Sequence, residues 1–448
     1  MSRMLKTTAL AAALLWLIAP PCLAREKPKG PKADKLQSEI DRLFSGEISF
    51  EDGGEFEKAC LEIDAILAKD KKGEALRAPG FWSAAIHEAW FSGKTRKSAR
   101  NKMLKTEPVK DEKDNVLTEF AYWGPAKYKP KESYTLLLSV LPKGQDPVKY
   151  LETTWLANET AKSEFVLVAV AESDTFQISK DPMATIIDVI ARVRFMFNID
   201  ADRWFFEGVG DGCVPVQTFV SKHAPDRVAG MILRNPLAMA DTTNATMING
   251  LIVHGGDTSQ GVKVFQGYAA IDAEKFEGAT ATDQAAATTR IAEWIMAHPG
   301  RGLPAKYTYT TLIDDKNQGE NYTGTMFIIP AKRGTRTTVT VTYDRETNSV
   351  DIQAENLGEF EIRMNDDLLD LDKEVVIVVN GTEVAKRVFQ RSLRDMLVTA
   401  LGDGETGRLW SATFRGFVPT EIEAPAEDGA GKGDGAKKGD GGDKKDKD

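Results

Sequence analysis

The sequence predicts an α/β fold: a mostly parallel β-sheet covered on both faces by helices, preceded by a helical segment and followed by a small β-sandwich-like domain. Fully apolar runs such as Tyr134–Leu141 and Phe165–Ala171 alternate with helical patterns, which is typical of a parallel sheet buried on both sides. The stretch Arg203–Asn235 has the pattern strand, glycine turn, helix and strand, as expected of one unit of such a sheet. After residue 306, polar and apolar residues alternate, which favours a sandwich.

The amino-terminal residues 1–24 have the pattern of a signal peptide. Basic Arg3 and Lys6 precede the apolar run Thr7–Ala19, and Cys22-Leu23-Ala24 resembles a cleavage site. We therefore expect export to a periplasm or the medium, with no transmembrane segment after cleavage. Without this segment the formal charge is (58 − 2) − 67 = −11, and a chain this acidic with scattered basic residues argues against nucleic-acid binding.

The cysteines and histidines predict no metal site and no cofactor. After signal removal only Cys60 and Cys213 remain; they fall in different predicted elements, so two buried free thiols are favoured over a disulfide, which stays the alternative. The chain has neither CxxC nor HxxxH spacing. Its histidines are isolated from one another: His87, His223, His254 and His298.

The segment after a polar leader, residues 25–34, is predicted to be helical. Leu36, Ile40 and Leu43 fall on one helical face. We expect these helices to pack on the sheet domain as a cap or brace. The predicted division of the chain is: signal peptide 1–24, helical segment 25–110, sheet domain 111–305, β-rich domain 306–423 and disordered tail 424–448.

The sheet domain is predicted to alternate strands and helices. The strands are Leu117–Trp123, Tyr134–Leu141, Phe165–Ala171, Arg203–Glu207, Val228–Leu233 and Leu251–His254. The helices are Leu151–Ala161, Ile186–Phe197, Cys213–His223 and Ile291–His298.

The β-rich domain is predicted from alternating patterns and one strong turn signal. Its strands are Thr337–Tyr343, Ser349–Ala354, Glu359–Met364, Glu374–Val379 and Leu409–Phe414, interrupted by a helix at Ser392–Leu401. Asn380-Gly381 between two strands indicates a hairpin turn.

The turn Gly208-Val209-Gly210-Asp211-Gly212 resembles the nucleophile elbow of the α/β-hydrolase superfamily. The resemblance is to secreted bacterial esterases and peptidases of the prolyl-oligopeptidase and dienelactone-hydrolase type. It also rests on Asp200, Asp202-Arg203, Pro225-Asp226-Arg227 and Ala229, on the lead-in Lys127–Pro130, and on Leu368–Val384, which resembles an accessory β domain of large secreted hydrolases.

The resemblance places Gly210 where a hydrolase carries its nucleophilic serine. Asp211 and Cys213 lie beside that position. A turn or helix-capping role is favoured for Asp211, and a buried packing role for Cys213. The sequence therefore has the frame of an elbow without a nucleophile.

The sequence also departs from the hydrolase pattern at the positions of the catalytic base and of the oxyanion loop. The resemblance places the catalytic histidine near Lys275–Asp283, where the chain has none. Asp257 matches the position of the triad acid, but without a histidine to orient, it would be a vestigial acid. A loop or helix-capping role is therefore favoured for Asp257. After the early strand, Ser139–Gly144 lacks the glycine-rich oxyanion loop.

Three functions are consistent with this pattern. The first is a non-catalytic pseudo-hydrolase that binds a small-molecule or protein ligand in the vestigial pocket, or serves as a scaffold. The second is a divergent ester or peptide hydrolase with a non-standard site near Gly210, Asp211 and Asp257. The third is a purely structural role in which the β-rich domain and tail attach the chain to an envelope or to a partner complex whose identity is unknown.

Overall fold

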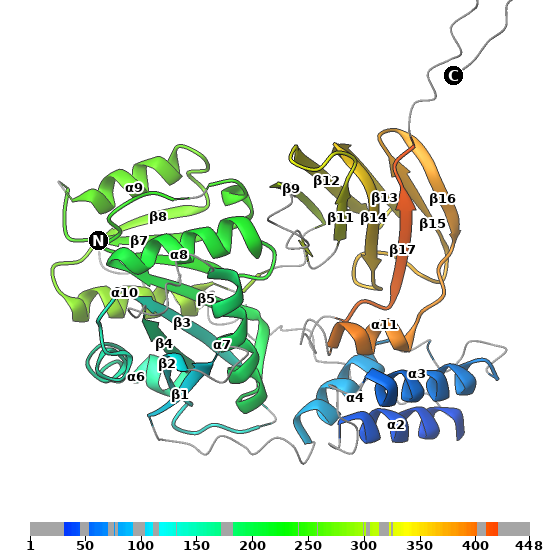
Figure 1. Cartoon of the computed structure of the whole chain (residues 1–448), viewed down its shortest axis with the longest axis horizontal. Coiled ribbons are helices and arrows are strands. Elements are labelled where there is room, and N and C mark those ends of the chain that lie inside the picture. Colours follow the sequence, from blue (N-terminus) through cyan, green and yellow to red (C-terminus); the bar gives the residue numbers. More distant parts are fainter. Residues whose placement is uncertain are drawn as a thin grey trace, which may run out of the picture. The chain divides into compact units, whose positions relative to one another are not determined.

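A computed structural model describes residues 31–44, 53–69, 76, 79–92, 104–110, 116–130, 132–171, 182–240, 242–257, 259–298, 300–301, 305–312, 322–323, 326–400 and 409–419. In chain order these residues form a group of helices, a large sheet with helices, and two smaller sheets (Figure 1). The predicted signal peptide and the predicted tail lie outside the described residues, so both stay predictions.

The amino-terminal helices are confirmed as α2 (Pro31–Phe44), α3 (Gly53–Leu67) and α4 (Pro79–Ser92). Helix α2 begins inside the predicted leader, because proline is well suited to the first turn of a helix. Its apolar stripe, Leu36, Ile40 and Leu43, is fully buried.

The expectation that these helices brace the sheet domain is wrong. They share a hydrophobic core with helix α11 (Leu393–Val398) of the carboxyl-terminal region, where Trp82 is buried together with Leu393 and Leu397. An ion pair of 2.6 Å joins Arg394 of α11 to Glu57 of α3. The helices that meet here, α2–α4 and α11, are separated by more than 300 residues of sequence. Helical periodicity shows which face of a helix is apolar, but not which other helix covers that face.

The large sheet has eight strands in the order β1-β2-β4-β3-β5-β6-β7-β8. Strand β2 is antiparallel to β1 and β4, and every other pair is parallel, which confirms the predicted mostly parallel sheet. The strands are β1 Lys105–Lys110, β2 Val116–Trp123, β3 Tyr134–Leu141, β4 Phe165–Ala171, β5 Ile199–Val209, β6 Gly230–Arg234, β7 Gly250–His254 and β8 Phe276–Thr280.

Helices pack against this sheet in two hydrophobic cores, one on each face. They are α5 Pro147–Tyr150, the π-helix η2 Leu151–Trp155, α6 Glu159–Glu164, α7 Pro182–Met196, α8 Cys213–Thr218, the π-helix η4 Phe219–His223, α9 Gln260–Ala269 and α10 Gln284–Ala297. The predicted helix Leu151–Ala161 is therefore broken. Asn158 caps α6 by accepting from the Ala161 N–H at 3.0 Å, and asparagine favours such caps.

Sequence reading missed the two edge strands, β1 and β8. In β1 only Val109 is buried, and in β8 only Phe276 is buried. An edge strand with polar residues lacks the apolar run by which central parallel strands are recognised. Because β8 occupies part of Lys275–Asp283, the predicted histidine-free base loop shrinks to Ala281–Asp283.

The carboxyl-terminal region forms two antiparallel-rich sheets, in the orders β10-β11-β14-β17 and β16-β15-β13-β12-β9. The strands are β9 Lys306–Leu312, β10 Tyr322–Thr323, β11 Met326–Pro330, β12 Arg336–Asp344, β13 Ser349–Glu355, β14 Leu357–Met364, β15 Glu374–Val379, β16 Thr382–Val388 and β17 Ala412–Phe417. Asn380 and Gly381 both have positive φ, 49° and 81°, which confirms the predicted hairpin turn.

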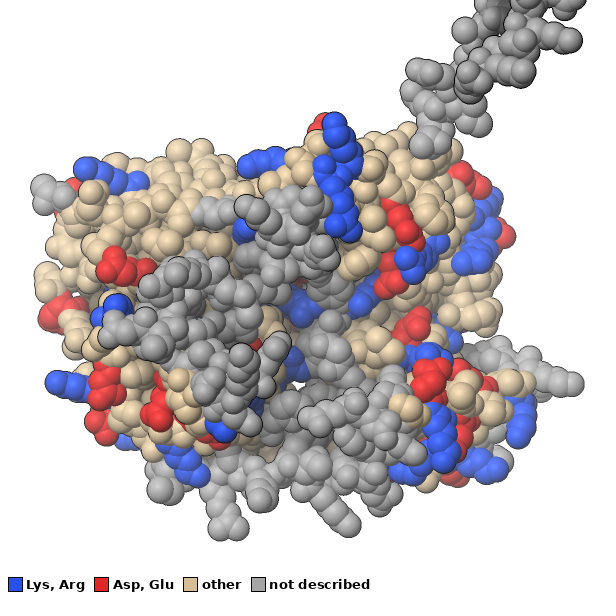
Figure 2. Space-filling model, viewed as in Figure 1, with Lys and Arg blue, Asp and Glu red and all other residues tan. Residues whose placement is uncertain are grey.

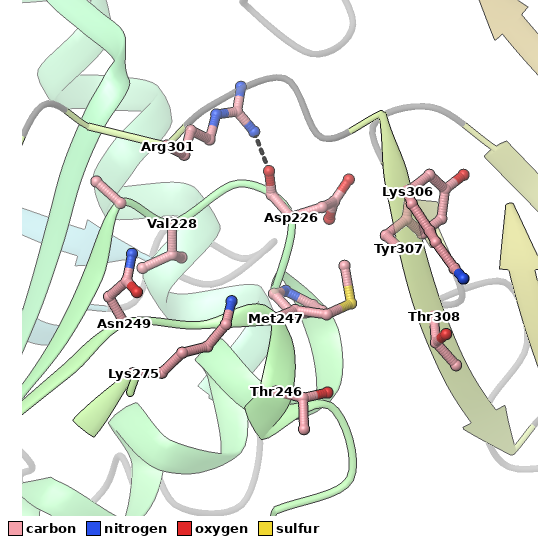
Figure 3. A pocket seen from close by; sticks show the side chains of 12 residues that line it. Asp226, Val228, Thr246, Met247, Asn249, Lys275, Arg301, Lys306, Tyr307 and Thr308 are labelled. Atoms are coloured by element: carbon pink, nitrogen blue, oxygen red, sulfur yellow. Dashed lines mark hydrogen bonds between the residues drawn. The ribbon is translucent and has the colours of Figure 1, made fainter. Parts of the chain in front are cut away.

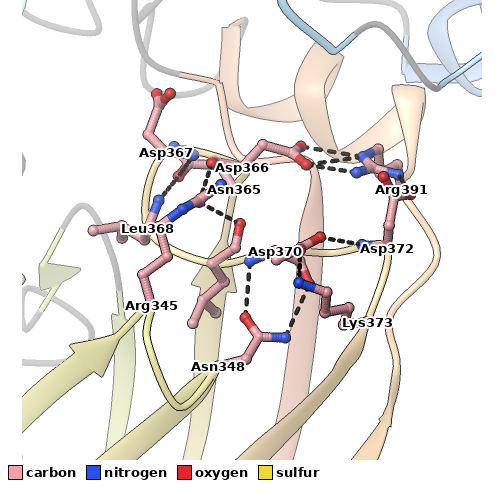
Figure 4. A network of polar contacts seen from close by, with 11 residues as sticks. Arg345, Asn348, Asn365, Asp366, Asp367, Leu368, Asp370, Asp372, Lys373 and Arg391 are labelled. Carbon is pink, nitrogen blue, oxygen red and sulfur yellow. Dashed lines mark hydrogen bonds and ion pairs between the residues drawn. The ribbon is translucent and has the colours of Figure 1, made fainter.

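A polar network organises the loop before β15 (Figure 4). Asn348, buried and at φ 54°, donates to the carbonyls of Asp370 and Glu374 at 2.9 and 2.8 Å and accepts from the Asp370 N–H at 2.8 Å. Arg391 pairs with Asp366 and, at 2.7 Å, with Asp372. Side chains thus satisfy the backbone of a loop that has no ladder partners.

We predict that Asn348→Gly lowers the free energy of unfolding by about 2–3 kcal/mol, because three hydrogen bonds are lost and their buried backbone partners stay unsatisfied. Asn380→Gly is the matched control: it also keeps a left-handed residue but loses hydrogen bonds to Ala354 in an exposed turn, so about 1 kcal/mol or less is expected. Urea denaturation of both variants measures the difference. Equal midpoints would show that the Asn348 side chain contributes nothing special.

The surface charges are mixed. Basic and acidic side chains are interspersed over the described part of the face in Figure 2, in agreement with the scattered basic residues of the sequence. Among the described residues no helix has the length and apolarity needed to cross a membrane. Cys60 and Cys213 are both free and buried, as predicted.

Candidate functional site

The turn between β5 and α8 places Gly210 at the apex of a sharp bend. Gly210 begins a 3-10 turn, Gly210–Gly212, and has φ +53°. Glycine adopts this left-handed conformation without strain. In a nucleophile elbow the serine stands on the same kind of strand-to-helix turn, so the backbone here has elbow geometry.

The two flanking glycines are required by close packing. A Cβ at Gly208 would overlap the backbone of Cys213 in α8, and a Cβ at Gly212 would overlap the carbonyl oxygen of Val140 in β3. By contrast, a Cβ at Gly210 would meet only Pro142 Cγ, at 3.4 Å. The spacing of small residues therefore holds helix α8 tightly against strands β3 and β5 and leaves the apex open.

The sheet order, the antiparallel second strand and the elbow after β5 occur together in one known arrangement. This is an α/β-hydrolase fold. In such a fold the acid follows β7, the base follows β8, and the oxyanion loop follows β3, all at the carboxyl edge of the sheet.

No protein-family model matches the sequence, and no curated protein matches it. Solved structures similar to this α/β-hydrolase fold include a thermostable esterase, at 14% identity and TM-score 0.36, with 43% of this chain and 62% of that chain covered. They also include the Porphyromonas gingivalis dipeptidyl peptidase 4, at 13% identity and TM-score 0.33, with 44% of this chain and 36% of that chain covered. A ferulic acid esterase is similar at 8% identity and TM-score 0.37, with 45% of this chain and 99% of that chain covered. The chain thus spans less than two thirds of the first two proteins.

No hydroxyl stands at the hydrolase elbow, since Gly210 has no side chain. Of the two roles expected for Asp211, turn or helix cap, the structure shows the turn: the N-cap of α8 is Gly212, and no side chain caps the helix. Asp211 is exposed. A solvated carboxylate beside the apex differs from a nucleophile held at the apex itself.

Cys213 is fully buried against β6, as predicted. Its thiol donates to the Arg234 carbonyl oxygen at 3.7 Å. Burial, assisted by the charge of Glu207, raises the pKa of the Cys213 thiol well above its usual value. The reactive thiolate is therefore suppressed at neutral pH.

Neither of the two histidines whose side chains the structure describes is placed to act as a base. His298 ends α10, where its Nδ1 lies 2.8 Å from the Trp294 carbonyl, and its own carbonyl accepts from Arg203 at 2.9 Å. Arg203 lies well before the end of β5, so His298 is at the edge of the sheet remote from Gly210. His254, at the end of β7, is buried and packs against Gly261 of α9. The side chains of His87 and His223 lie outside the described set.

Asp257 follows β7, where the fold carries its acid, but it is exposed in a turn. The predicted loop role is confirmed. The other expected role, a helix cap, belongs to Ser259, whose side chain accepts from the Val262 N–H at the start of α9. In the oxyanion loop Pro142 follows β3 directly, and proline has no N–H to donate.

A cavity of about 310 Å³ opens at the carboxyl edge of the sheet, beside the elbow. Val209, the residue before Gly210, contributes to it. The other lining residues come from the carboxyl ends of β6 and β7 and from the segments after β3, β6, β7 and β8: Gln145, Tyr150, Arg234, Asn235, Val253, Gly255, Ala281, Thr282, Asp283, Gln284 and Ala287. This volume is at the small end of the range for ligand pockets. The cavity is therefore bounded by the carboxyl ends of the parallel strands and the segments that follow them.

Beneath the elbow lies a buried polar network that sequence reading missed. The fully buried carboxylate of Glu207 accepts from Ser139 Oγ at 2.6 Å, Tyr150 OH at 2.9 Å and Trp155 Nε1 at 3.1 Å. It also forms an ion pair of 2.8 Å with Arg234 Nε. The sequence did contain a signal for this network: Glu207 interrupts the apolar run of a predicted strand. A charged side chain that is buried in a strand needs hydrogen-bonding or ion-pair partners.

The same network extends to the helix α10. Arg234 Nη1 donates to Thr288 Oγ1 at 3.1 Å, and the guanidinium lies 5.5 Å from the Trp155 ring. Burial, reinforced by Glu207, raises the pKa of Tyr150 well above its usual value, so this phenol stays protonated and donates. Because four donors occupy Glu207 away from solvent, the network is suited to hold β3, β5, β6 and η2 together and not to activate water.

Proposed function

We propose that this chain is a non-catalytic α/β-hydrolase-fold protein that binds a ligand in the cavity at the carboxyl edge of its sheet. The main support for this proposal is Gly210. The turn around it has the backbone conformation and close packing of an elbow, but glycine offers no nucleophilic atom. The loop Ala281–Asp283 supports the proposal, since it offers no histidine where a base would stand. Without nucleophile and base, triad-dependent acyl transfer has no chemical route.

We also propose that the protein is exported and works in a periplasm or outside the cell. The signal-peptide pattern of residues 1–24 supports this. Fractionation of cells that express the full chain, with sequencing of the mature amino terminus, tests it. A cytoplasmic protein that retains Met1 would contradict export.

A fluorophosphonate probe tests the lack of a nucleophile directly. We expect no covalent labelling of the folded protein, because the probe needs an activated serine. Gly210→Ser is the informative second arm: it restores the hydroxyl at an open position but has no base to activate it, so its labelling should stay at background. A serine hydrolase run in parallel controls for probe quality. Labelling of native protein that maps to residues 116–298 would overturn the proposal.

The divergent hydrolase is the second candidate, favoured by two carboxylates near the carboxyl edge. Asp211 and Asp257 are both exposed, and an exposed carboxylate can accept a hydrogen bond from water and orient it. Purified protein is assayed on activated esters and on peptides, with Asp211→Asn and Asp257→Asn as test variants and Asp188→Asn as a remote control. Turnover abolished by either test variant alone supports this candidate. A flat response supports the binding role.

A further inference from the structure

We propose that the chain carries a second ligand site, at the opposite edge of the sheet, for a small organic dianion. The site is a cavity of about 360 Å³ lined by Pro225, Asp226, Val228, Ala229, Thr246, Met247, Asn249, Lys275, Arg301, Lys306, Tyr307 and Thr308. Val228 and Ala229 precede β6, Asn249 precedes β7 and Lys275 precedes β8. The cavity therefore lies at the amino ends of the parallel strands and is separate from the elbow.

The walls of this cavity come from two parts of the chain (Figure 3). Met247, Asn249 and Lys275 belong to the sheet domain, whereas Lys306 and Tyr307 belong to β9 of the β-rich region. Ligand pockets occur preferentially at such junctions.

Specific hydrogen bonds hold the two walls together. The amide of Asn244 donates to the Thr310 carbonyl at 3.1 Å and accepts from the Thr310 N–H at 2.7 Å. Tyr309 OH donates to the Lys222 carbonyl at 3.1 Å. Met247 also packs against the cores of both parts. The cavity is therefore built by a fixed junction and not by a chance approach of two surfaces.

The charges that line the cavity favour an anion. Lys275, Arg301 and Lys306 are cationic, and Asp226 is the one acidic residue of the lining. Because Asp202 pairs with Arg301, the balance is three positive against two negative charges, a formal charge of about +1. The chain as a whole carries −9, so this concentration of positive charge is against the general trend.

The three cations are placed differently. The Arg301 side chain, 7% exposed, is fixed by Asp202 at 3.3 Å and by the Asp226 carbonyl. In the described part of the chain, neither the Lys275 nor the Lys306 ammonium has an ion-pair partner. Two ammonium groups without an ion-pair partner, beside a fixed guanidinium, can bind an oxyanion by charge-assisted hydrogen bonds. Thr246, Asn249 and Thr308 add neutral polar groups to the same walls.

Titration with inorganic phosphate and with succinate tests this site, followed by calorimetry and by the melting temperature. We expect saturable binding that raises the melting temperature and exceeds the effect of chloride at equal ionic strength. Lys275→Gln and Lys306→Gln should each weaken binding roughly tenfold, because each removes one charge-assisted contact. Lys263→Gln on α9, an exposed lysine outside the cavity, should leave binding unchanged.

The outcomes separate the ligand sources and the proposals. Binding of phosphate alone indicates that the natural ligand is a phosphate ester, and binding of succinate alone indicates a dicarboxylate. Either result supports the dianion site if the Lys275 and Lys306 variants lose the binding. No saturable binding beyond chloride, or equal binding by the Lys275 and Lys306 variants, overturns the site. Melting of the variants without anion checks that each is folded. None of these results bears on the missing nucleophile, so the proposed function stands or fails separately.

Discussion

Replacing Glu207 by alanine is expected to lower the free energy of unfolding by about 3–5 kcal/mol. Its carboxylate is the common acceptor for donors from β3, α5, η2 and β6. Removal leaves the Arg234 charge buried without its counter-ion, and the freed hydroxyl and indole donors lose their acceptor. A stranded buried charge is far more costly than the loss of a surface pair.

Urea denaturation followed by tryptophan fluorescence measures this effect. Asp188→Ala is the matched control, because it breaks the half-exposed pair of Asp188 with Arg192 at 2.9 Å; less than about 1 kcal/mol is expected there. In the double variant Glu207→Leu with Arg234→Met, the loss should be smaller than for Glu207→Ala, since no charge is left unpaired. A Glu207→Ala midpoint equal to that of Asp188→Ala would show that the network contributes no special stability.

An alanine at position 212 is expected to lower the free energy of unfolding by about 3 kcal/mol or more, as an overpacking substitution against rigid backbone. The added methyl would overlap the Val140 carbonyl in the central strand β3, and neither α8 nor β3 can move without disturbing a fully buried core. Gly210→Ala is the paired variant. Its methyl has room, but φ +53° is left-handed and should cost about 1–2 kcal/mol.

The order of the two glycine variants is the decisive quantity, and thermal or urea melts give it directly. Gly212→Ala should be clearly the less stable of the two, with Gly210→Ala still folded at room temperature. The reverse order would mean that α8 does not pack on β3 as the structure has it. A folded Gly210→Ala would also show that the apex tolerates a side chain, so that the missing serine is not a requirement of the fold.

Much of the fold could be predicted because central parallel strands are apolar on both faces. Strands β3 and β4 were predicted with the bounds that the structure shows. The hairpin at Asn380-Gly381 was predicted because these two residue types favour the left-handed conformation of a tight turn. Edge strands β1 and β8 were missed, since only one residue of each is buried. The broken helix around Asn158 was missed because apolar spacing continues across a capping residue.

The candidate site could be predicted in part, because the glycines of the elbow lie together in sequence. Their roles differ in a way that only contacts reveal: Gly208 and Gly212 are held by neighbouring backbone, whereas Gly210 is free on its open side. The cavity at the amino edge had no sequence signal, since its lysines are separated by 31 positions and come from different sheets.

The sequence by itself determined the alternation of strands and helices, the glycine frame of the elbow and the absence of serine and histidine at the expected positions. These are local properties, set by side-chain periodicity, turn chemistry and residue identity. Tertiary structure alone decided that the amino-terminal helices pack on α11, that Glu207 finds its four donors, and that Lys275 and Lys306 face one cavity. Each of these depends on contacts between residues distant in the chain, where burial and electrostatic complementarity, and not local pattern, select the partner.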